Sequence, residues 1–174
     1  GAGKAVVSRV VKEKNWAIVV MGDVIREETC SRGLEPTPEN IGKIMLQLRE
    51  EEGAATVARR CIPKIENART SIVFVDGVRS LDEVVEFRKR FQDFTLISVH
   101  ASPETRFQRL SKRKRSDDPE GWDIFSQRDL RELSVGQGDA IAMADYMIVN
   151  EGKYQDFKAK VLEVLRMVVR KWKR

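Results

Sequence analysis

The chain has 174 residues, of which 41% are hydrophobic and 34% are charged, and its 32 Lys and Arg residues against 27 Asp and Glu residues give a net charge of +5. This length suits one domain with a substantial core, and no apolar run is long enough to cross a bilayer, which argues against a membrane partner and favours a cytoplasmic setting. A single histidine and two isolated cysteines, Cys30 and Cys61, argue against a structural metal site and a disulfide framework. The positive charge is compatible with anionic small molecules or with nucleic acid, and chooses neither.

The first four residues, Gly1-Ala2-Gly3-Lys4, resemble the second half of a phosphate-binding loop. Glycines let successive backbone N–H groups converge on phosphate oxygens, the following helix directs the positive end of its dipole at them, and the lysine reaches the outer phosphates. The complete motif starts several residues earlier, after a buried strand, so we expect the chain to be truncated at its start. The alternative is a flexible N-terminal stub before a surface helix. The predicted ATP contacts in this segment are Gly1, Ala2, Gly3, Lys4 and Ala5.

The rest of the chain alternates predicted strands with predicted helices. After Lys4, apolar residues at helical spacing predict a helix with Val6, Val7, Val10 and Val11 on one face. Short apolar runs predict buried parallel strands over residues 17–21, 72–75, 95–99 and 146–149. Further helices are predicted over residues 38–51, 54–68, 81–91, 103–113, 123–133 and 153–172. This alternation predicts a three-layer α/β fold whose parallel sheet, with the strand that is missing before Gly1, has five strands and helices on both faces.

Two segments that each contain a carboxylate and an arginine follow predicted strands. The first is Gly22-Asp23-Val24-Ile25-Arg26, and the second is Asp76-Gly77-Val78-Arg79-Ser80. Ligands of parallel α/β sheets gather at the carboxyl ends of the strands, and the donor fork of an arginine suits phosphate oxygens. We therefore expect both segments to face the phosphate-binding loop across a crevice. The alternative is two ordinary loops with surface ion pairs.

These segments resemble those of adenylate kinases. Gly22-Asp23-x-x-Arg26 is similar to their acceptor-phosphate segment, and Asp76-Gly77-Val78-Arg79 is similar to their Asp-Gly-(two residues)-Arg segment, shortened by one residue. The resemblance implies that Asp23, Arg26 and Arg79 bind the acceptor, with both arginines on its phosphate. It also implies that Asp76 organises water around the Mg²⁺ that accompanies ATP.

A basic stretch over residues 106–115 lies where these kinases have a lid, which we expect at about 106–133 in a single domain over residues 1–174. Arg109 and Arg113 resemble the lid arginines of adenylate kinases, which cover the adenine and the phosphates. The segment Arg115-Ser116-Asp117-Asp118 and the later Arg128 resemble the end of that lid. The resemblance implies that Arg109, Arg113 and Arg128 are catalytic together with Lys4 and Asp76. We expect Trp122 to pack the base of the lid. A nucleic-acid patch and a solvated helix face are the alternatives for this stretch.

The segment Ala144-Asp145-Tyr146-Met147-Ile148-Val149-Asn150 resembles the adenine-side loop of dephospho-CoA kinases. This resemblance implies ATP contacts from Asn150 and Gly152, in addition to Arg109. Over nearly the whole chain, the nearest resemblance is to an archaeal group of adenylate-kinase-related P-loop proteins. One departure concerns the metal: a P-loop lysine is usually followed by Ser or Thr, whose hydroxyl ligates Mg²⁺, but Ala5 and Val6 follow Lys4 here.

The sequence therefore predicts a P-loop NTPase fold and a phosphotransferase of the nucleoside monophosphate kinase type, with ATP, Mg²⁺ and a nucleotide-like acceptor. Two alternatives stay open. One is a nucleotide-gated ATPase of RNA or ribosome assembly, for which nucleic acid is a partner, and the other is a nucleotide-binding protein without chemistry. The basic tail over residues 170–174 is compatible with nucleic-acid contact, but we prefer the interpretation that it complements the dipole of the last helix.

Overall fold

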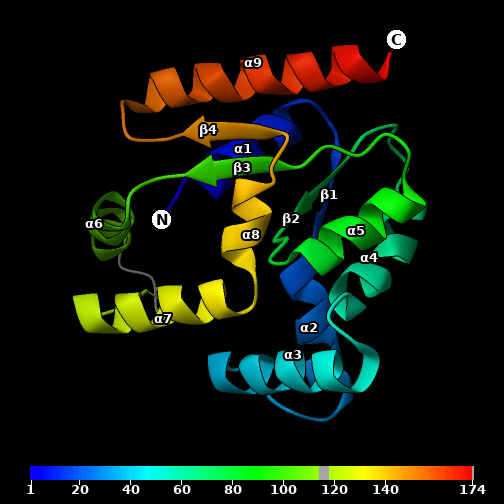
Figure 1. The fold of residues 1–174 in the computed structure, drawn as a ribbon, viewed down its shortest axis with the longest axis vertical. Coiled ribbons are helices and arrows are strands. Elements are labelled where there is room, and N and C mark those ends of the chain that lie inside the picture. Colours follow the sequence, from blue (N-terminus) through cyan, green and yellow to red (C-terminus); the bar gives the residue numbers. More distant parts are fainter. Residues whose placement is uncertain (114–117, 174) are drawn as a thin grey trace. The chain divides into compact units, whose positions relative to one another are not determined.

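The computed structural model describes residues 1–113 and 118–173 (Figure 1). In chain order, its elements are α1 (Lys4–Glu13), β1 (Ala17–Val20), α2 (Met21–Ser31), α3 (Pro38–Glu52), α4 (Thr56–Glu66), β2 (Val73–Asp76), α5 (Leu81–Arg90), β3 (Ile97–His100), α6 (Pro103–Arg113), α7 (Trp122–Ser134), α8 (Gln137–Ala142), β4 (Tyr146–Val149) and α9 (Tyr154–Trp172). The chain divides into two compact units. The first unit joins Gly1–Lys14 to Thr95–Arg174, and the second unit is Asn15–Phe94.

The second unit is built on a parallel pair of strands, β1 and β2. Ala17 lies opposite Val73, and Val20 lies opposite Asp76, so the two strands start and end together. Helices α2, α3, α4 and α5 turn their apolar faces toward the core of this unit, because burying that stripe stabilises each helix more than its intrinsic propensity does. The buried core residues are Val19, Met21, Val24, Ile25, Ile44, Leu48, Val57, Ala58, Cys61 and Phe87.

The first unit is built on the other parallel pair, β3 and β4. Ile97 lies opposite Tyr146. One residue before each strand, the carboxylate of Asp145 accepts a hydrogen bond from the backbone N–H of Leu96 at 2.7 Å. This bond fixes the register at the amino ends of both strands, and the residues that follow them therefore leave from a common edge.

Helices α1 and α9 lie side by side in the first unit (Figure 1). Arg9 Nη1 donates to the hydroxyl of Tyr154 at 3.3 Å, and Lys158 Nζ lies 3.1 Å from Glu13 Oε1. The spacing of apolar residues on α9 buries one face of the helix and leaves the opposite face in solvent. The buried residues are Phe157, Val161, Val164, Leu165 and Val168.

An aromatic cluster connects α6 to α7. The rings of Phe107 and Trp122 meet edge to face with centroids 5.3 Å apart, and Phe125 lies within 5.5 Å of both. The guanidinium of Arg106 lies over the ring of Phe125, at 5.2 Å from its centroid. These contacts agree with the expectation that Trp122 packs the base of this helical segment.

The four predicted strands are present and parallel, and in the described residues they form two pairs, β1 with β2 and β3 with β4. The single five-stranded sheet stays a prediction. An apolar run identifies a buried strand but not its partner, which lies far away in the sequence. Helices α2 and α8 were not predicted, and α1 was predicted without bounds. The remaining helices begin and end within two residues of the prediction. No helix in the described part of the chain is both long enough and apolar enough to span a membrane.

Candidate functional site

The predicted phosphate-binding loop leads directly into α1. Gly3 is the N-cap residue of that helix and has a φ of 114°, a left-handed conformation that favours glycine. A Cβ at Gly3 would lie 2.4 Å from Nδ2 of Asn150 and 3.1 Å from the ring of Phe157. Lys4 and Ala5 begin the helix and are exposed, and no side chain in the described residues caps its first turn. The backbone N–H groups of this turn and the Lys4 ammonium can therefore receive an anion.

Asn150, at the end of β4, holds the loop in place. Its side-chain Nδ2 donates to the backbone oxygen of Ala2 at 2.8 Å, and its backbone N–H donates to the oxygen of His100 at 2.8 Å. Arg109 of α6 donates to the backbone oxygen of Asn150 at 3.0 Å and to its Oδ1 at 3.4 Å. Asn150 is buried, with 6% of its surface exposed. Asn150, which the sequence predicts to contact ATP, thus connects the loop to α6 in this structure.

Positive charge gathers around Gly1. Four cations act electrostatically on Gly1, the first residue of the predicted loop, namely Arg113, Arg106, Lys4 and Arg128. Three of the predicted catalytic cations thus act on the same loop: Lys4, Arg113 and Arg128. Such a concentration of cations attracts a phosphate group to the start of α1.

Ion pairs hold the arginines of α6. Both terminal nitrogens of Arg106 lie 2.6 Å from the carboxylate of Asp129 on α7, and its Nε donates to the backbone oxygen of Ala101 at 3.0 Å. Arg113, at the end of α6, donates from Nε to Asp118 at 3.0 Å. Sequence analysis did not single out the pair between Arg106 and Asp129, because its members lie on different helices. The predicted lid-exit residues Arg115, Ser116 and Asp117 lie outside the described residues.

In the second unit, the two predicted acceptor segments follow paired strands. Asp76 lies opposite Val20, so β1 and β2 end at the same edge. Gly77 then adopts a φ of 114°, and a Cβ at this glycine would lie 3.5 Å from Cβ of Met21, the first residue of α2. The structure therefore brings the start of α2 and the segment after β2 together within this unit.

The first acceptor segment lies in the first turns of α2, whereas the alternative interpretation expected an ordinary loop. Four residues of α2 at helical spacing are buried, namely Met21, Val24, Ile25 and Thr29. Burying this face favours a helix directly after the strand. Asp23 and Arg26 lie on the outer face with 52% and 55% of their side chains exposed, and they form an ion pair with each other. This pair is the surface interaction that the alternative interpretation expected.

Glu83, which the sequence analysis missed, anchors the segment that carries Arg79. Only 1% of Glu83 is exposed. Its Oε2 accepts the backbone N–H of Arg79 at 2.7 Å, and its Oε1 accepts Nη2 of Arg49 on α3 at 2.9 Å. Ser80 caps α5 by accepting the backbone N–H of Glu83 at 3.3 Å. The spacing of Ser80 and Glu83 is that of a capping box, a sequence signal that could have identified this residue.

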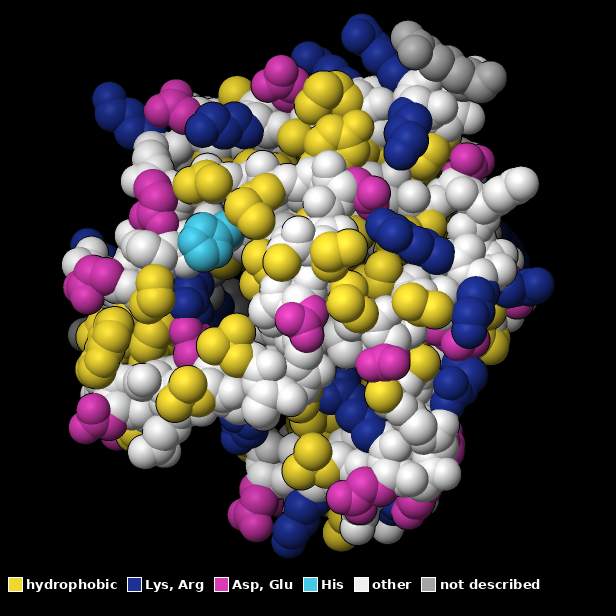
Figure 2. Space-filling view, in the orientation of Figure 1, with side chains coloured by type: hydrophobic (Ala, Val, Ile, Leu, Met, Phe, Trp, Pro, Cys, Tyr) yellow, Lys and Arg dark blue, Asp and Glu magenta, His cyan; other side chains and the backbone are white. Residues whose placement is uncertain are grey.

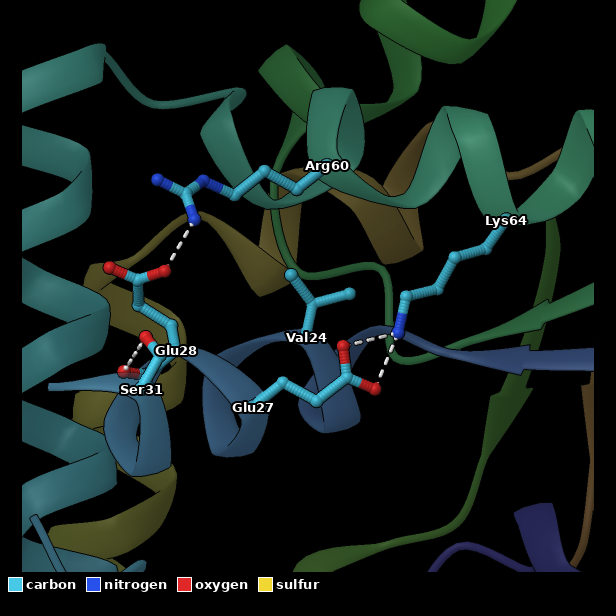
Figure 3. Close-up of a pocket in the computed structure, with 6 residues that line it drawn as sticks. All are labelled: Val24, Glu27, Glu28, Ser31, Arg60 and Lys64. Carbon is cyan, nitrogen blue, oxygen red and sulfur yellow. Dashed lines mark hydrogen bonds and ion pairs between the residues drawn. The ribbon is translucent and has the colours of Figure 1, made fainter. Parts of the chain in front are cut away.

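A pocket of about 280 Å³ lies between α2 and α4 in the same unit (Figure 3). Across it, Lys64 Nζ lies 2.5 Å from both carboxylate oxygens of Glu27, and Arg60 Nη1 lies 2.7 Å from Glu28 Oε2. Arg60 also pairs with Glu52, at the end of α3, at 2.5 Å. The charged side chains around the pocket pair with one another, and these ion pairs hold α2 against α4 and α3. We call this set of ion pairs the junction of α2, α3 and α4.

Comparison with known proteins identifies the family. Residues 1–124 match the family described as AAA domain. The chain is 48% identical over 165 residues to the UPF0200 protein of Hyperthermus butylicus, which covers 95% of this chain and 88% of that protein. It is 46% identical over 171 residues to the UPF0200 protein MJ1399 of Methanocaldococcus jannaschii, with coverage of 97% and 86%. This chain belongs to the UPF0200 family.

UPF0200 membership and the AAA domain match establish a P-loop domain of the α/β class. Domains of this class typically use Mg²⁺ together with ATP. Within residues 1–113 and 118–173, no group of three or more His, Cys, Asp and Glu side chains could hold a metal ion. Mg²⁺ is usually bound by one or two carboxylates together with phosphate oxygens and water, and Asp76, at the end of β2, is the predicted carboxylate. This donor set fits an ion that arrives with the nucleotide.

The predicted site residues of this UPF0200 protein divide between the two units. Those of the first unit are Gly1, Ala2, Gly3, Lys4, Ala5, Arg109, Arg113, Arg128, Asn150 and Gly152. Those of the second unit are Asp23, Arg26, Asp76 and Arg79. Gly152 lies exposed between β4 and α9, with nothing within 4 Å of the place where a Cβ would be. It is the one donor-side residue for which the described contacts give no connection to the loop.

Proposed function

We propose that this protein is a phosphotransferase of the nucleoside monophosphate kinase type, which transfers the γ-phosphate of ATP to a nucleotide-like acceptor. One observation carries the proposal: a left-handed Gly3 precedes α1, with Lys4 in its first turn and the charges of Arg113 and Arg128 acting on the same loop. The AAA domain match supports nucleotide binding. The proposal includes one domain over residues 1–174, a five-stranded parallel sheet and a lid at about 106–133.

On the donor side, the backbone N–H groups of residues 1–5 bind phosphate oxygens, and Lys4 binds the β- and γ-phosphates. Arg109, Arg113 and Arg128 neutralise the charge that spreads over the equatorial oxygens of the transferred group. To do so, Arg109 gives up its hydrogen bond to Asn150 and binds a phosphate oxygen instead. Arg113 likewise gives up its bond to Asp118 and binds a phosphate oxygen. Closure of the helical segment is thereby coupled to the arrival of the triphosphate.

On the acceptor side, Arg26 and Arg79 bind the phosphate of the acceptor, and Asp23 orients Arg26. An oxygen of that phosphate attacks the γ-phosphorus of ATP, and the bond from this phosphorus to the bridging oxygen of ADP breaks. No covalent enzyme intermediate forms. Asp76 holds the water around Mg²⁺, an ion that reduces the negative charge of the ATP phosphates when bound.

The first experiment combines calorimetry of ATP binding with a screen of acceptors. The Lys4→Ala change removes a charged contact worth about 1.5–3 kcal/mol, so ATP affinity should fall by about tenfold or more. Unchanged affinity would contradict the phosphate-binding loop. Turnover with nucleoside monophosphates, compared with dephospho-CoA, identifies the acceptor, since the segment before Asn150 resembles the dephospho-CoA kinases.

The second experiment separates acceptor from donor. The Arg79→Ala change should raise the acceptor KM or lower kcat by about tenfold or more and leave ATP affinity intact, because in the proposed mechanism Arg79 binds the acceptor and not ATP. Arg69→Ala is the matched control, since Arg69 is an exposed arginine of the same unit. Loss of ATP binding in the Arg79 variant would place this residue on the donor side.

A nucleotide-binding protein without chemistry is the second candidate, and Ala5 and Val6 favour it. Neither side chain offers the hydroxyl that P-loop enzymes use for Mg²⁺. Saturable ATP binding, combined with no turnover in the presence of any acceptor of the screen, identifies this candidate. Turnover that disappears in the Lys4→Ala variant excludes it.

A further inference from the structure

The net charge of the chain comes from one of its two units. The first unit contains 20 Lys and Arg against 13 Asp and Glu, a net charge of +7, whereas the second unit contains 12 against 14, a net charge of −2. The arginines of α6 and α7 belong to the proposed ATP site and account for part of this excess. The remainder lies on α9 and on α1 beside it, and the proposed kinase reaction does not use these cations.

The solvent face of α9 carries a row of cations, which we call the α9 basic row. Arg166 and Arg170 of α9 and Lys173, the C-cap residue directly after it, follow one another at spacings of four and three residues, and all three are exposed. They lie opposite the buried apolar face of the helix. Lys160 and Lys171 are exposed beside this row. After Glu163, no acidic residue follows on the helix.

The α9 basic row is available to an external anion. Within the part of the chain that the structure describes, no carboxylate forms an ion pair with Arg166, Arg170 or Lys173. Lysine and arginine side chains lie along α9 on the face drawn in Figure 2. By contrast, Lys158 on the same helix is neutralised by Glu13 of α1. The α9 basic row therefore retains its full charge.

Helix stabilisation does not explain the whole row. Cations in the last turn interact favourably with the helix dipole, and this applies to Arg170 and Lys171. Arg166 lies well before the last turn, where the dipole effect has faded. A membrane surface does not fit either, because the apolar face of α9, which would have to enter the lipid, is buried in the protein.

The row matches a partner whose negative charges repeat along a line. From Arg166 to Lys173, the chain rises by about 10 Å, and a nucleic-acid duplex carries one phosphate per about 3.4 Å along each strand. We propose that the α9 basic row binds the phosphate backbone of a nucleic acid without sequence preference. This surface is separate from the proposed ATP site, so its test does not depend on kinase activity.

The test measures binding of a short fluorescein-labelled RNA strand and of a DNA duplex of the same sequence, by anisotropy at a series of salt concentrations. The triple change Arg166→Gln, Arg170→Gln and Lys173→Gln keeps a good helix former at each position. We expect it to reduce the slope of log K against log salt by about 2 for the single strand or about 3 for the duplex. The probe with the higher affinity distinguishes RNA from DNA.

Two control variants make the test decisive. The first control is a triple variant of exposed residues in the second unit, with the changes Lys43→Gln, Arg69→Gln and Lys89→Gln. It removes the same charge and should leave the slope of log K against log salt unchanged. Arg109→Gln with Arg113→Gln tests the lid in the same way. An unchanged slope in the α9 variant, an equal loss in the second-unit control, or a loss confined to the lid variant would overturn the proposal.

A third arm addresses lipid as the source of phosphate. Vesicles that contain phosphatidylserine are titrated with the same variants, and binding to these vesicles without binding to either nucleic acid would also overturn the proposal. If the triple variant fails to fold, judged by its circular dichroism, the single Arg166→Gln variant replaces it, with an expected loss of about 0.7–0.9 in slope.

Discussion

At the scale of single residues, Gly3 and Gly152 are a matched pair of glycines. Gly3 combines a left-handed φ of 114° with no room for a Cβ, whereas Gly152 has neither restriction. A left-handed conformation alone costs an alanine about 1–2 kcal/mol, and the contact with Asn150 adds to this. Gly3→Ala should therefore lower Tm by about 2–8 °C in a protein of this size and weaken ATP binding.

Calorimetric unfolding and ATP titration of the two variants check this prediction. Gly152→Ala should keep both the Tm and the ATP affinity of the unmodified chain. Equal behaviour of the two variants would mean that the contact between Gly3 and Asn150 does not constrain the loop.

Glu83 carries the second prediction at this scale. Its carboxylate and the Arg49 guanidinium are 1% and 13% exposed, and removing one partner of a buried pair leaves an uncompensated charge. Glu83→Ala should lower the free energy of unfolding by about 3–5 kcal/mol, as measured by urea denaturation. Replacing both partners, with Arg49→Met and Glu83→Ala, should cost less than the sum of these two changes measured singly. Additive costs would contradict a direct coupling.

Sequence patterns identify candidate site residues more readily than they identify the partners of those residues in the fold. Lys4 and Arg79 stand out because glycines and strand ends surround them. Glu83 remained unnoticed, although its capping-box spacing to Ser80 is visible in the sequence. Its bond to Arg49, 34 residues earlier, depends on how α3 packs within the second unit, and no local pattern encodes that.

At the scale of elements, α2 was missed for a related reason. We interpreted Met21 as the end of a strand, whereas it starts a helix without any intervening loop. Apolar residues at positions 21, 24 and 25 fit both a buried strand end and the first turns of a helix, and packing against the core decides between them. The long amphipathic helices, such as α3 and α9, were predicted within one residue because their apolar period extends over several turns.

The junction of α2, α3 and α4 yields a prediction on pH. Arg60, and then Thr56, lower the pKa of Glu52 from 4.5 to about 2, and Arg32, and then Arg60, lower the pKa of Glu28. A carboxyl whose pKa is lower in the folded state stabilises the fold above its unfolded pKa, and this contribution disappears as the pH falls through the folded pKa. The unfolding free energy should therefore decrease between about pH 4.5 and pH 2.

Arg60→Gln should make this decrease shallower, because the main partner of Glu52 is lost. Urea denaturation at pH 7, pH 4 and pH 2.5, about the range in which carboxyls titrate, measures the effect. Arg69→Gln is the control, since Arg69 is an exposed arginine of the same unit without a role in the junction. Parallel pH profiles for Arg60→Gln and the unmodified chain would contradict the role of the junction.

At the scale of the whole molecule, the predicted donor and acceptor groups belong to different units, and this predicts where ligands protect the backbone. ATP should slow hydrogen exchange in residues 1–13 of the first unit, because it contacts the loop and the start of α1. A nucleoside monophosphate should slow exchange in residues 21–26 and 76–80 of the second unit. Exchange monitored by mass spectrometry resolves these segments, and protection of α2 by ATP alone would contradict the assignment of the two sides.

The division into units could not be predicted from the sequence. Four parallel strands were expected from their apolar runs, and all four are present. Their pairing, β1 with β2 and β3 with β4, depends on contacts between residues about 50 positions apart, such as Ile97 and Tyr146. By contrast, the different net charges of the two units follow directly from the sequence once the bounds of the units are known.

The hydrogen bonds of Asn150 have a consequence for the ageing of the protein. Asparagine is thermolabile, and loss of its amide as ammonia leaves an aspartate of nearly the same size. An oxygen would then replace the nitrogen that lies 2.8 Å from the carbonyl of Ala2, and two acceptors would face each other. Arg109, meanwhile, would gain a negatively charged neighbour to compete with phosphate. Loss of one amide from this buried side chain would thus remove the hydrogen bond that connects the loop to the end of β4.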